Sequence, residues 1–146
     1  MRNTKWLVER TKFILRRYFP DIRLDNNLVV KFGQKAKTRL GSIKYGSPRG
    51  EAGKDGKVHP NTIITLSGYF QDEKVPDFVL DATLAHEISH YSHGFFSPRQ
   101  RLYHHPHHGG VVKREMLDRG LEDMLKLQKK WLRENWIRFI KKESNE

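Results

Sequence analysis

Residues 75–94 of the chain read VPDFVLDATLAHEISHYSHG, and the assignment of the fold starts from this stretch. Pro76 suits the first turn of a helix, Gly94 suits its end, and apolar residues recur between them at helical spacing. The stretch therefore predicts a helix that opens at Val75 and runs to about His93. We expect this helix to be half-buried, with an apolar face formed by Leu80, Leu84, Ile88 and Tyr91.

Two histidines lie one turn apart on the other face of this helix. His86 and His90 are four residues apart, so their Cβ atoms would lie about 5–6 Å from each other and both imidazoles could reach one zinc ion. Glu87 lies about 100° further round the helix, where it could contact a water molecule on the metal. This H-E-x-x-H pattern is typical of metal-assisted hydrolysis, in which the carboxylate is the general base. The alternative is a surface helix with solvated histidines.

A zinc ion held by His86 and His90 needs a third protein ligand. The chain has no cysteine, so this ligand must be His, Asp or Glu. A histidine-rich loop follows the helix, and its candidates are His104, His105, His107 and His108. Glu115 or Glu122 is a less favoured alternative. His93 follows on the same helix face, where we expect it to lie behind the ligands, face the substrate or cap the helix.

The remaining pattern predicts one α+β domain with helices on one face of a small sheet of three to four strands. An amphipathic helix is expected over residues 3–18, followed by strands at Leu28–Phe32, Leu40–Tyr45 and Thr62–Leu66. Glycines between residues 46 and 60 predict a mobile loop. Further helices are expected from about Gly110 to Gly120 and over Leu121–Lys142.

The positive charge of the chain is concentrated near its N-terminus. The 146 residues carry a net charge of +11, and residues 1–50 hold 13 Lys and Arg against 3 Asp and Glu. Such an excess is a candidate nucleic-acid surface, and without a base-reading motif the binding would be independent of sequence. The residues that we expect to contact phosphates are Lys12, Arg16, Arg17, Lys35, Lys37 and Arg39. The alternative is a generically basic protein.

The sequence contains no run of 18 or more apolar residues, so we expect no membrane span. Its first residues lack the apolar core of a secretory signal. We therefore expect a cytoplasmic protein, associated with the nucleoid if it binds DNA.

Two segments resemble the SprT-like zinc metallopeptidases, which include the Spartan-type proteases. One is residues 75–90, and the other is His108-Gly109-Gly110-Val111-Val112 followed by Gly120. Residues around Tyr18-Phe19-Pro20 and Arg39-Leu40-Gly41 are also similar to the family. The resemblance implies a zincin-like catalytic domain over residues 1–120 and a zinc endopeptidase that acts on proteins attached to DNA. The chain departs from the many members with a cysteine-rich extension, because residues 121–146 predict a basic amphipathic helix packed on the same domain.

The resemblance also implies roles for individual residues. His86 and His90 become zinc ligands and Glu87 the general base. The His-Gly step favours His108 as the third ligand, although the distance to Gly120 suits His107 equally. In zincins the strand before the active-site helix binds the substrate backbone, and the residues of that edge strand are here Thr62, Ile63, Ile64, Thr65 and Leu66. The hydroxyl of Tyr91 or Tyr103 is a candidate oxyanion donor, with ordinary packing as the alternative.

The competing function is a non-catalytic zinc-containing protein that binds nucleic acid. Glu87 favours the enzyme, because a closed structural zinc site needs no carboxylate beside its first histidine.

Overall fold

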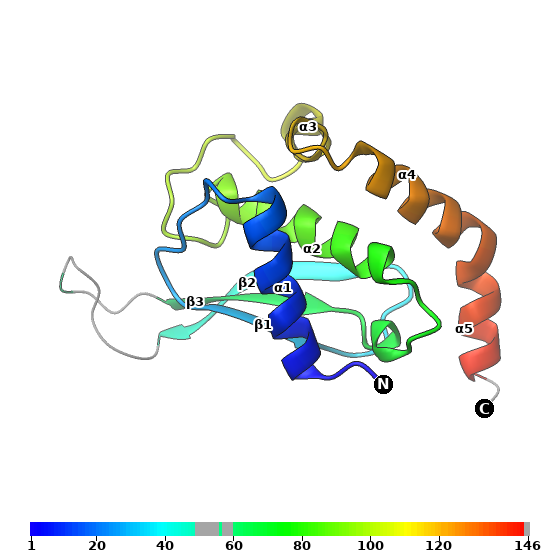
Figure 1. Ribbon diagram of the computed structural model, residues 1–146. Helices are drawn as coiled ribbons and strands as arrows, with labels where there is room; N and C mark the ends of the chain where they lie inside the picture. The colour runs from blue at the N-terminus through cyan, green and yellow to red at the C-terminus, as the bar shows by residue number, and fades with distance from the viewer. Residues whose placement is uncertain (49–55, 57–59, 145–146) are drawn as a thin grey trace.

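A three-stranded mixed sheet underlies this α+β fold, which is known from a computed structural model that describes residues 1–48, 56 and 60–144. The strands are β1 (Leu28–Phe32), β2 (Gly41–Pro48) and β3 (Pro60–Leu66), in the order β1-β3-β2. Figure 1 shows α1 (Thr4–Tyr18) and α2 (Asp77–Ser92) on the same face of this sheet. The predicted α+β class and the small sheet are confirmed.

The prediction that Thr62–Leu66 is an edge strand is wrong, because β3 is the central strand. Ile64, for example, is in register with Val30 of β1 on one side and with Ile43 of β2 on the other. A strand that is paired on both sides has no free backbone groups to offer an extended peptide. In the described part of the sheet β2 is an edge strand beside α2, and its first residue, Gly41, packs against α2.

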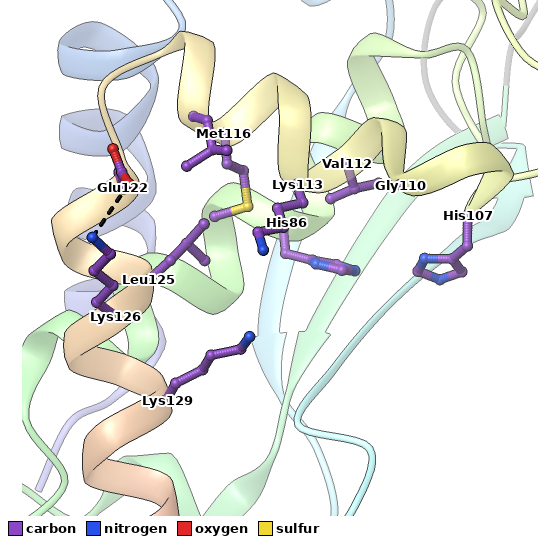
Figure 2. A pocket seen from close by; sticks show the side chains of 11 residues that line it. His86, His107, Gly110, Val112, Lys113, Met116, Glu122, Leu125, Lys126 and Lys129 are labelled. Atoms are coloured by element: carbon purple, nitrogen blue, oxygen red, sulfur yellow. Dashed lines mark ion pairs between the residues drawn. The ribbon is translucent and has the colours of Figure 1, made fainter.

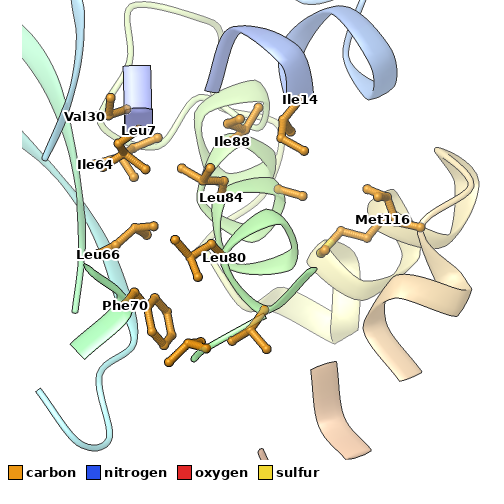
Figure 3. Close-up of a cluster of buried hydrophobic side chains, with 14 of the residues drawn as sticks. Leu7, Ile14, Val30, Ile64, Leu66, Phe70, Leu80, Leu84, Ile88 and Met116 are labelled. Atoms are coloured by element: carbon orange, nitrogen blue, oxygen red, sulfur yellow. The ribbon is translucent and has the colours of Figure 1, made fainter. Parts of the chain in front are cut away.

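Helix α2 begins at Asp77, two residues later than predicted, ends at Ser92 close to the predicted end, and is buried more completely than a half-buried helix. Pro76 is its N-cap residue and His93 its C-cap residue. Within α2 only Asp77, Phe78 and His86 are not buried. The core face of the helix packs against α1 and the sheet (Figure 3), in a cluster that includes Leu7, Ile14, Ile64, Leu66, Leu80, Leu84 and Ile88. The opposite face is covered as well, because the helices after residue 110 also pack on α2.

Two arginines, one just before α1 and one within it, attach the N-terminal segment to α2 and to the residues that precede it. Arg2 is buried, and its guanidinium donates to the carboxylate of Asp77 and to main-chain carbonyls that precede α2. Arg10 donates through two nitrogens to the buried carboxylate of Asp81. Part of the basic N-terminal sequence therefore stabilises the fold and is not available to a phosphate backbone.

The helices after residue 110 pack against α2 and against the connection between β1 and β2. They are α3 (Val111–Asp118), α4 (Glu122–Trp131) and α5 (Ile137–Ser144), and a π-helical turn over Leu132–Trp136 joins the last two. The amide of Gln128 donates to the carbonyl of Val79 and to the hydroxyl of Thr83 on α2, both at 2.9 Å. The indole of Trp136 donates to the carbonyl of Lys37 at 2.8 Å, which attaches this segment to the β1–β2 connection.

The predicted mobile loop over residues 46–60 is shorter than expected at its start, because β2 continues to Pro48 and pairs there with Pro60. Most of the predicted loop, residues 49–55 and 57–59, lies outside the described residues. Among the helices that the structure describes, none is long and apolar enough to cross a membrane.

Candidate metal centre

Three imidazoles converge where α2 faces the histidine-rich loop. They belong to His86, His90 and His107, and each offers a nitrogen within 4.8 Å of those of the other two. The Nε2 atoms of His86 and His90 are 3.2 Å apart. Two nitrogens bound tetrahedrally to one zinc ion would be about 3.3 Å apart, given zinc–nitrogen bonds of about 2.0–2.1 Å. The spacing of these residues therefore fits a shared zinc ion.

The third member of the group is His107 rather than the favoured His108. The ring centroid of His107 lies 4.8 Å from that of His90 and 5.6 Å from that of His86. The ring of His108 instead stacks on Tyr103, with centroids 6.3 Å apart, and meets the ring of His105 edge-on, with centroids 5.1 Å apart. The His-Gly step favours His108, whereas the distance to Gly120 suits His107 equally. The structure places His107 beside His86 and His90.

Two glycines at the end of the loop turn the chain from His107 into α3. Gly109 and Gly110 both have positive φ values, of 52° and 71°, in the left-handed region that side chains with a Cβ rarely adopt. A Cβ atom at either position would meet no atom within 4 Å, so the requirement is for backbone conformation and not for space. This turn fixes the direction in which His107 leaves the loop.

Burial keeps the two helix histidines neutral. It lowers the pKa of His86 to about 4, with a smaller contribution from the charge of His107. It lowers the pKa of His90 to about 3, with smaller contributions from the neighbouring histidines. A neutral imidazole is the form that binds metal, so both side chains are ready to coordinate at neutral pH. The Nδ1 atom of His90 is buried without a hydrogen-bond partner in the described part of the chain.

The carboxyl group of Glu87 lies beside this centre without belonging to it. Its side chain is buried, and burial raises the pKa of Glu87 to about 7, an increase that the positive charge of Arg39 opposes. The carboxyl group packs against Gly41, where an added Cβ atom would lie 3.4 Å from Oε1. A carboxyl group with a pKa near neutrality can both accept and release a proton, which suits a general base.

His93 is the C-cap residue of α2 and is not one of the three histidines that could hold a metal ion. It is buried, and its Nε2 lies 3.0 Å from the carboxylate of Glu115, which also pairs with Arg119. Glu115 therefore pairs with His93 and Arg119. Glu122, the other alternative ligand, pairs with Lys126 at 3.3 Å. Neither carboxylate belongs to the group of potential ligands that the described residues form.

The two tyrosines considered as oxyanion donors have packing roles. The hydroxyl of Tyr91 donates to the side chain of Asn26 and accepts from the main-chain nitrogen of Asp25, which attaches the end of α2 to the segment before β1. The ring of Tyr103 packs edge-on against His93, with centroids 4.8 Å apart.

The six basic residues expected to bind nucleic acid are all exposed, in two groups. Lys12, Arg16 and Arg17 lie on α1, whereas Lys35, Lys37 and Arg39 lie on the connection between β1 and β2. Arg39 also lines a cavity of about 250 Å³ together with His86 and Glu87. The sequence pattern had not connected Arg39 with the chemistry of Glu87.

A second and larger cavity adjoins the metal centre on its other side. It measures about 520 Å³, and His86 and His107 form part of its wall. The remaining lining residues come from α3, α4 and the residues just before α3 (Figure 2). The sequence had predicted these helices but gave no signal that they enclose a cavity next to the histidines.

Comparison of the chain with known protein families, with characterised proteins and with solved structures finds no significant match.

Proposed function

We propose that the protein is a zinc metalloendopeptidase of the zincin type, related to the SprT-like family, with His86, His90 and His107 as ligands and Glu87 as general base. The observation that carries this proposal is the convergence of three imidazoles beside a buried carboxyl group that is not one of the ligands. Histidine nitrogens in this number, with no thiolate, are a donor set that suits catalytic zinc.

When bound, zinc would polarise a carbonyl oxygen and activate a water molecule. Glu87 would take the proton from this water as its oxygen attacks the carbonyl carbon, and would pass the proton to the amine that leaves. The raised pKa of Glu87 supports this role, because a base with a pKa near the working pH both accepts and returns a proton readily.

Two features support a peptide as the substrate. The outer edge of β2 is unpaired in the described sheet, so an extended backbone could add to it as a further strand. Gly41, the first residue of that strand, packs against Glu87. A peptide lying along β2 would therefore pass close to the general base.

A non-catalytic zinc protein is the competing function, and the surroundings of the histidines disfavour it. Structural zinc sites are closed by four protein ligands. Within the described residues the group of potential ligands has three members, and His86 lines cavities on two sides. This arrangement leaves room for a substrate.

The test compares the wild type with Glu87→Gln for zinc content and for cleavage of unfolded protein and mixed peptide libraries. We expect the wild type to bind one zinc ion and to cleave, and the variant to keep its zinc while its rate falls by about 10²–10⁴-fold. A wild type that binds zinc but cleaves no peptide bond, or a variant with unchanged cleavage, would overturn the proposal.

A further inference from the structure

The larger cavity has an apolar floor and a basic mouth. Val112 and Met116 of α3 and Leu125 of α4 supply apolar side chains, and Val112 and Met116 are buried. In Figure 2 the side chains of Met116 and Leu125 point toward each other. The volume of about 520 Å³ is within the range of about 300–1,000 Å³ that is usual for ligand sites. It is ample for a large aliphatic or aromatic side chain.

Three lysines line the same cavity, and among the described residues two of them form no ion pair. Lys126 pairs with Glu122 at 3.3 Å. Lys113 of α3 and Lys129 of α4 form no ion pair within the part of the chain that the structure describes, and both are exposed. In Figure 2 the amine of Lys129 extends from α4 toward His86. The mouth of the cavity therefore carries unneutralised positive charge on two sides.

The larger cavity lies next to the place where we expect the cleaved bond of the substrate to bind. Its wall includes the metal ligands His86 and His107, whereas Glu87 lies in the smaller cavity on the other side of His86. His86 and Leu125 line both cavities. A substrate whose carbonyl lies between the metal centre and Glu87 would thus extend its neighbouring side chain into the larger cavity.

From this juxtaposition we infer that the α3–α4 cavity selects substrates with a large apolar side chain next to the cleaved bond and a carboxylate close to it, which Lys113 and Lys129 bind. The inference rests on the proposed peptidase function and adds a substrate class to it. An apolar floor discriminates against small side chains, and two free ammonium groups favour an anion and repel a cation. The carboxylate belongs either to an Asp or Glu side chain or to the C-terminus of a short peptide.

The first test measures binding without turnover, by fluorescence anisotropy of labelled decapeptides on the zinc-loaded Glu87→Gln protein. The peptides place Leu or Ala at one central position and Glu, Gln or Lys at the next, in a Gly-Ala background. We expect Leu to bind about 10-fold or more tighter than Ala, and Glu about 3- to 10-fold tighter than Gln. Peptides with a free or amidated terminus two residues after the Leu separate the two sources of carboxylate.

The second test reverses the charge at the mouth of the cavity. In Lys129→Glu we expect the preference for Glu over Lys to vanish or invert, while the preference for Leu over Ala remains. The matched control is Lys130→Glu, an exposed neighbour on α4 that does not line the cavity, and it should keep the wild-type preferences. Thermal unfolding of both variants verifies that the fold is intact.

Equal binding of Leu and Ala peptides, or identical charge preferences in Lys129→Glu and Lys130→Glu, would overturn the inference. Its failure is distinct from failure of the peptidase proposal. Selective binding without any cleavage by the wild type would reject the peptidase proposal and retain the inference about the cavity. Cleavage without any preference among the peptides would retain the peptidase proposal and reject the inference about the cavity.

Discussion

Gly41 of β2 lies so close to Thr83 of α2 that a Cβ atom added at Gly41 would stand 2.6 Å from the Cγ2 atom of Thr83. The same atom would stand 3.4 Å from Cγ and Oε1 of Glu87. The absence of a side chain at residue 41 therefore allows the first residue of the edge strand to approach the proposed general base. The packing of β2 against α2 therefore determines the surroundings of the Glu87 carboxyl group.

Gly41→Ala should displace Thr83 or β2, and with it the carboxyl group of Glu87. We expect a loss of about 1–3 kcal/mol in the free energy of unfolding, as is usual for an overpacked core, and a fall in kcat with little change in zinc affinity. Thr83→Ser removes the clashing methyl group and keeps the hydroxyl that donates to the Val79 carbonyl. The double variant should recover most of both losses, and an absence of rescue would show that the close approach of Gly41 does not limit Glu87.

Zinc affinity should separate His107 from His108. Both side chains are exposed, so replacement by Ala should leave the fold intact. We expect His107→Ala to weaken zinc binding by more than about 100-fold, since losing a ligand costs more than losing an outer partner, and His108→Ala to change it little. Competition with a chromophoric chelator measures both affinities. A larger loss in His108→Ala would assign the third ligand to His108.

The parts of this molecule that depend on local spacing were predictable from sequence. Pro76 and His93 bound α2 because helix ends carry local signals, and His86 and His90 meet because residues four apart share one helix face. The order of the strands was not predictable, since it depends on which strands pair across the sheet. The sequence therefore did not reveal that β3 is the central strand of the sheet and not an edge strand.

The position of the proposed third ligand and the burial of α2 also depend on distant contacts. His107 reaches the centre because of a turn at two glycines with positive φ values, and counting residues along the loop did not separate it from His108. Helices α3 and α4 pack on α2 from the side opposite to the core. The sequence of residues 75–94 alone carries no signal of this packing. The cavity between these helices follows from the same packing.

Burial of Glu87 should make the stability of the metal-free protein depend on pH. The pKa of Glu87 is raised to about 7 in the folded protein from an ordinary value of 4.5, so between these values the folded state binds more protons there than the unfolded state. This contribution is therefore complete below about pH 4.5 and is lost as the pH rises through 7. The loss should approach about 3 kcal/mol.

The Glu87→Gln variant does not lose stability in this way, because the side chain of Gln has no proton to release. With a chelator present, the free energy of unfolding of the variant minus that of the wild type should increase from pH 4.5 to pH 7 and stay level above about pH 8. His86 and His90 titrate in both proteins, so their effects largely cancel in the difference. Denaturant unfolding at several pH values measures it, and a constant difference would contradict a buried, neutral Glu87.

DNA binding, if it occurs through α1, should depend strongly on salt. Lys12, Arg16 and Arg17 are exposed on this helix, although Lys12 also lies 3.5 Å from Glu9. Removal of one cation that binds a phosphate should reduce the slope of log affinity against log salt by about 0.9 on duplex DNA. We expect Arg16→Gln with Arg17→Gln to lower the slope by almost 2, and Lys130→Gln to leave it unchanged. Binding without salt dependence would remove the electrostatic interpretation.

Arg39 should tune the pH dependence of cleavage rather than serve DNA binding alone. It lines the cavity that contains Glu87, and its positive charge lowers the pKa of that carboxyl group against the effect of burial. Arg39→Gln should therefore raise the pKa of Glu87 further, so a higher pH is needed to ionise the base. In the variant the acidic limb of the plot of kcat/KM against pH should shift to higher pH.

Lys37→Gln is the control for this prediction. Lys37 is an exposed cation on the same connection, and the structure does not place it among the residues that line the cavity with Glu87. If both variants lose the same DNA affinity but only Arg39→Gln shifts the pH profile, Arg39 acts on Glu87 through its charge. Equal profiles in the two variants would mean that Arg39 is too well solvated to influence the base, and its place in the cavity would then concern substrate or DNA contact only.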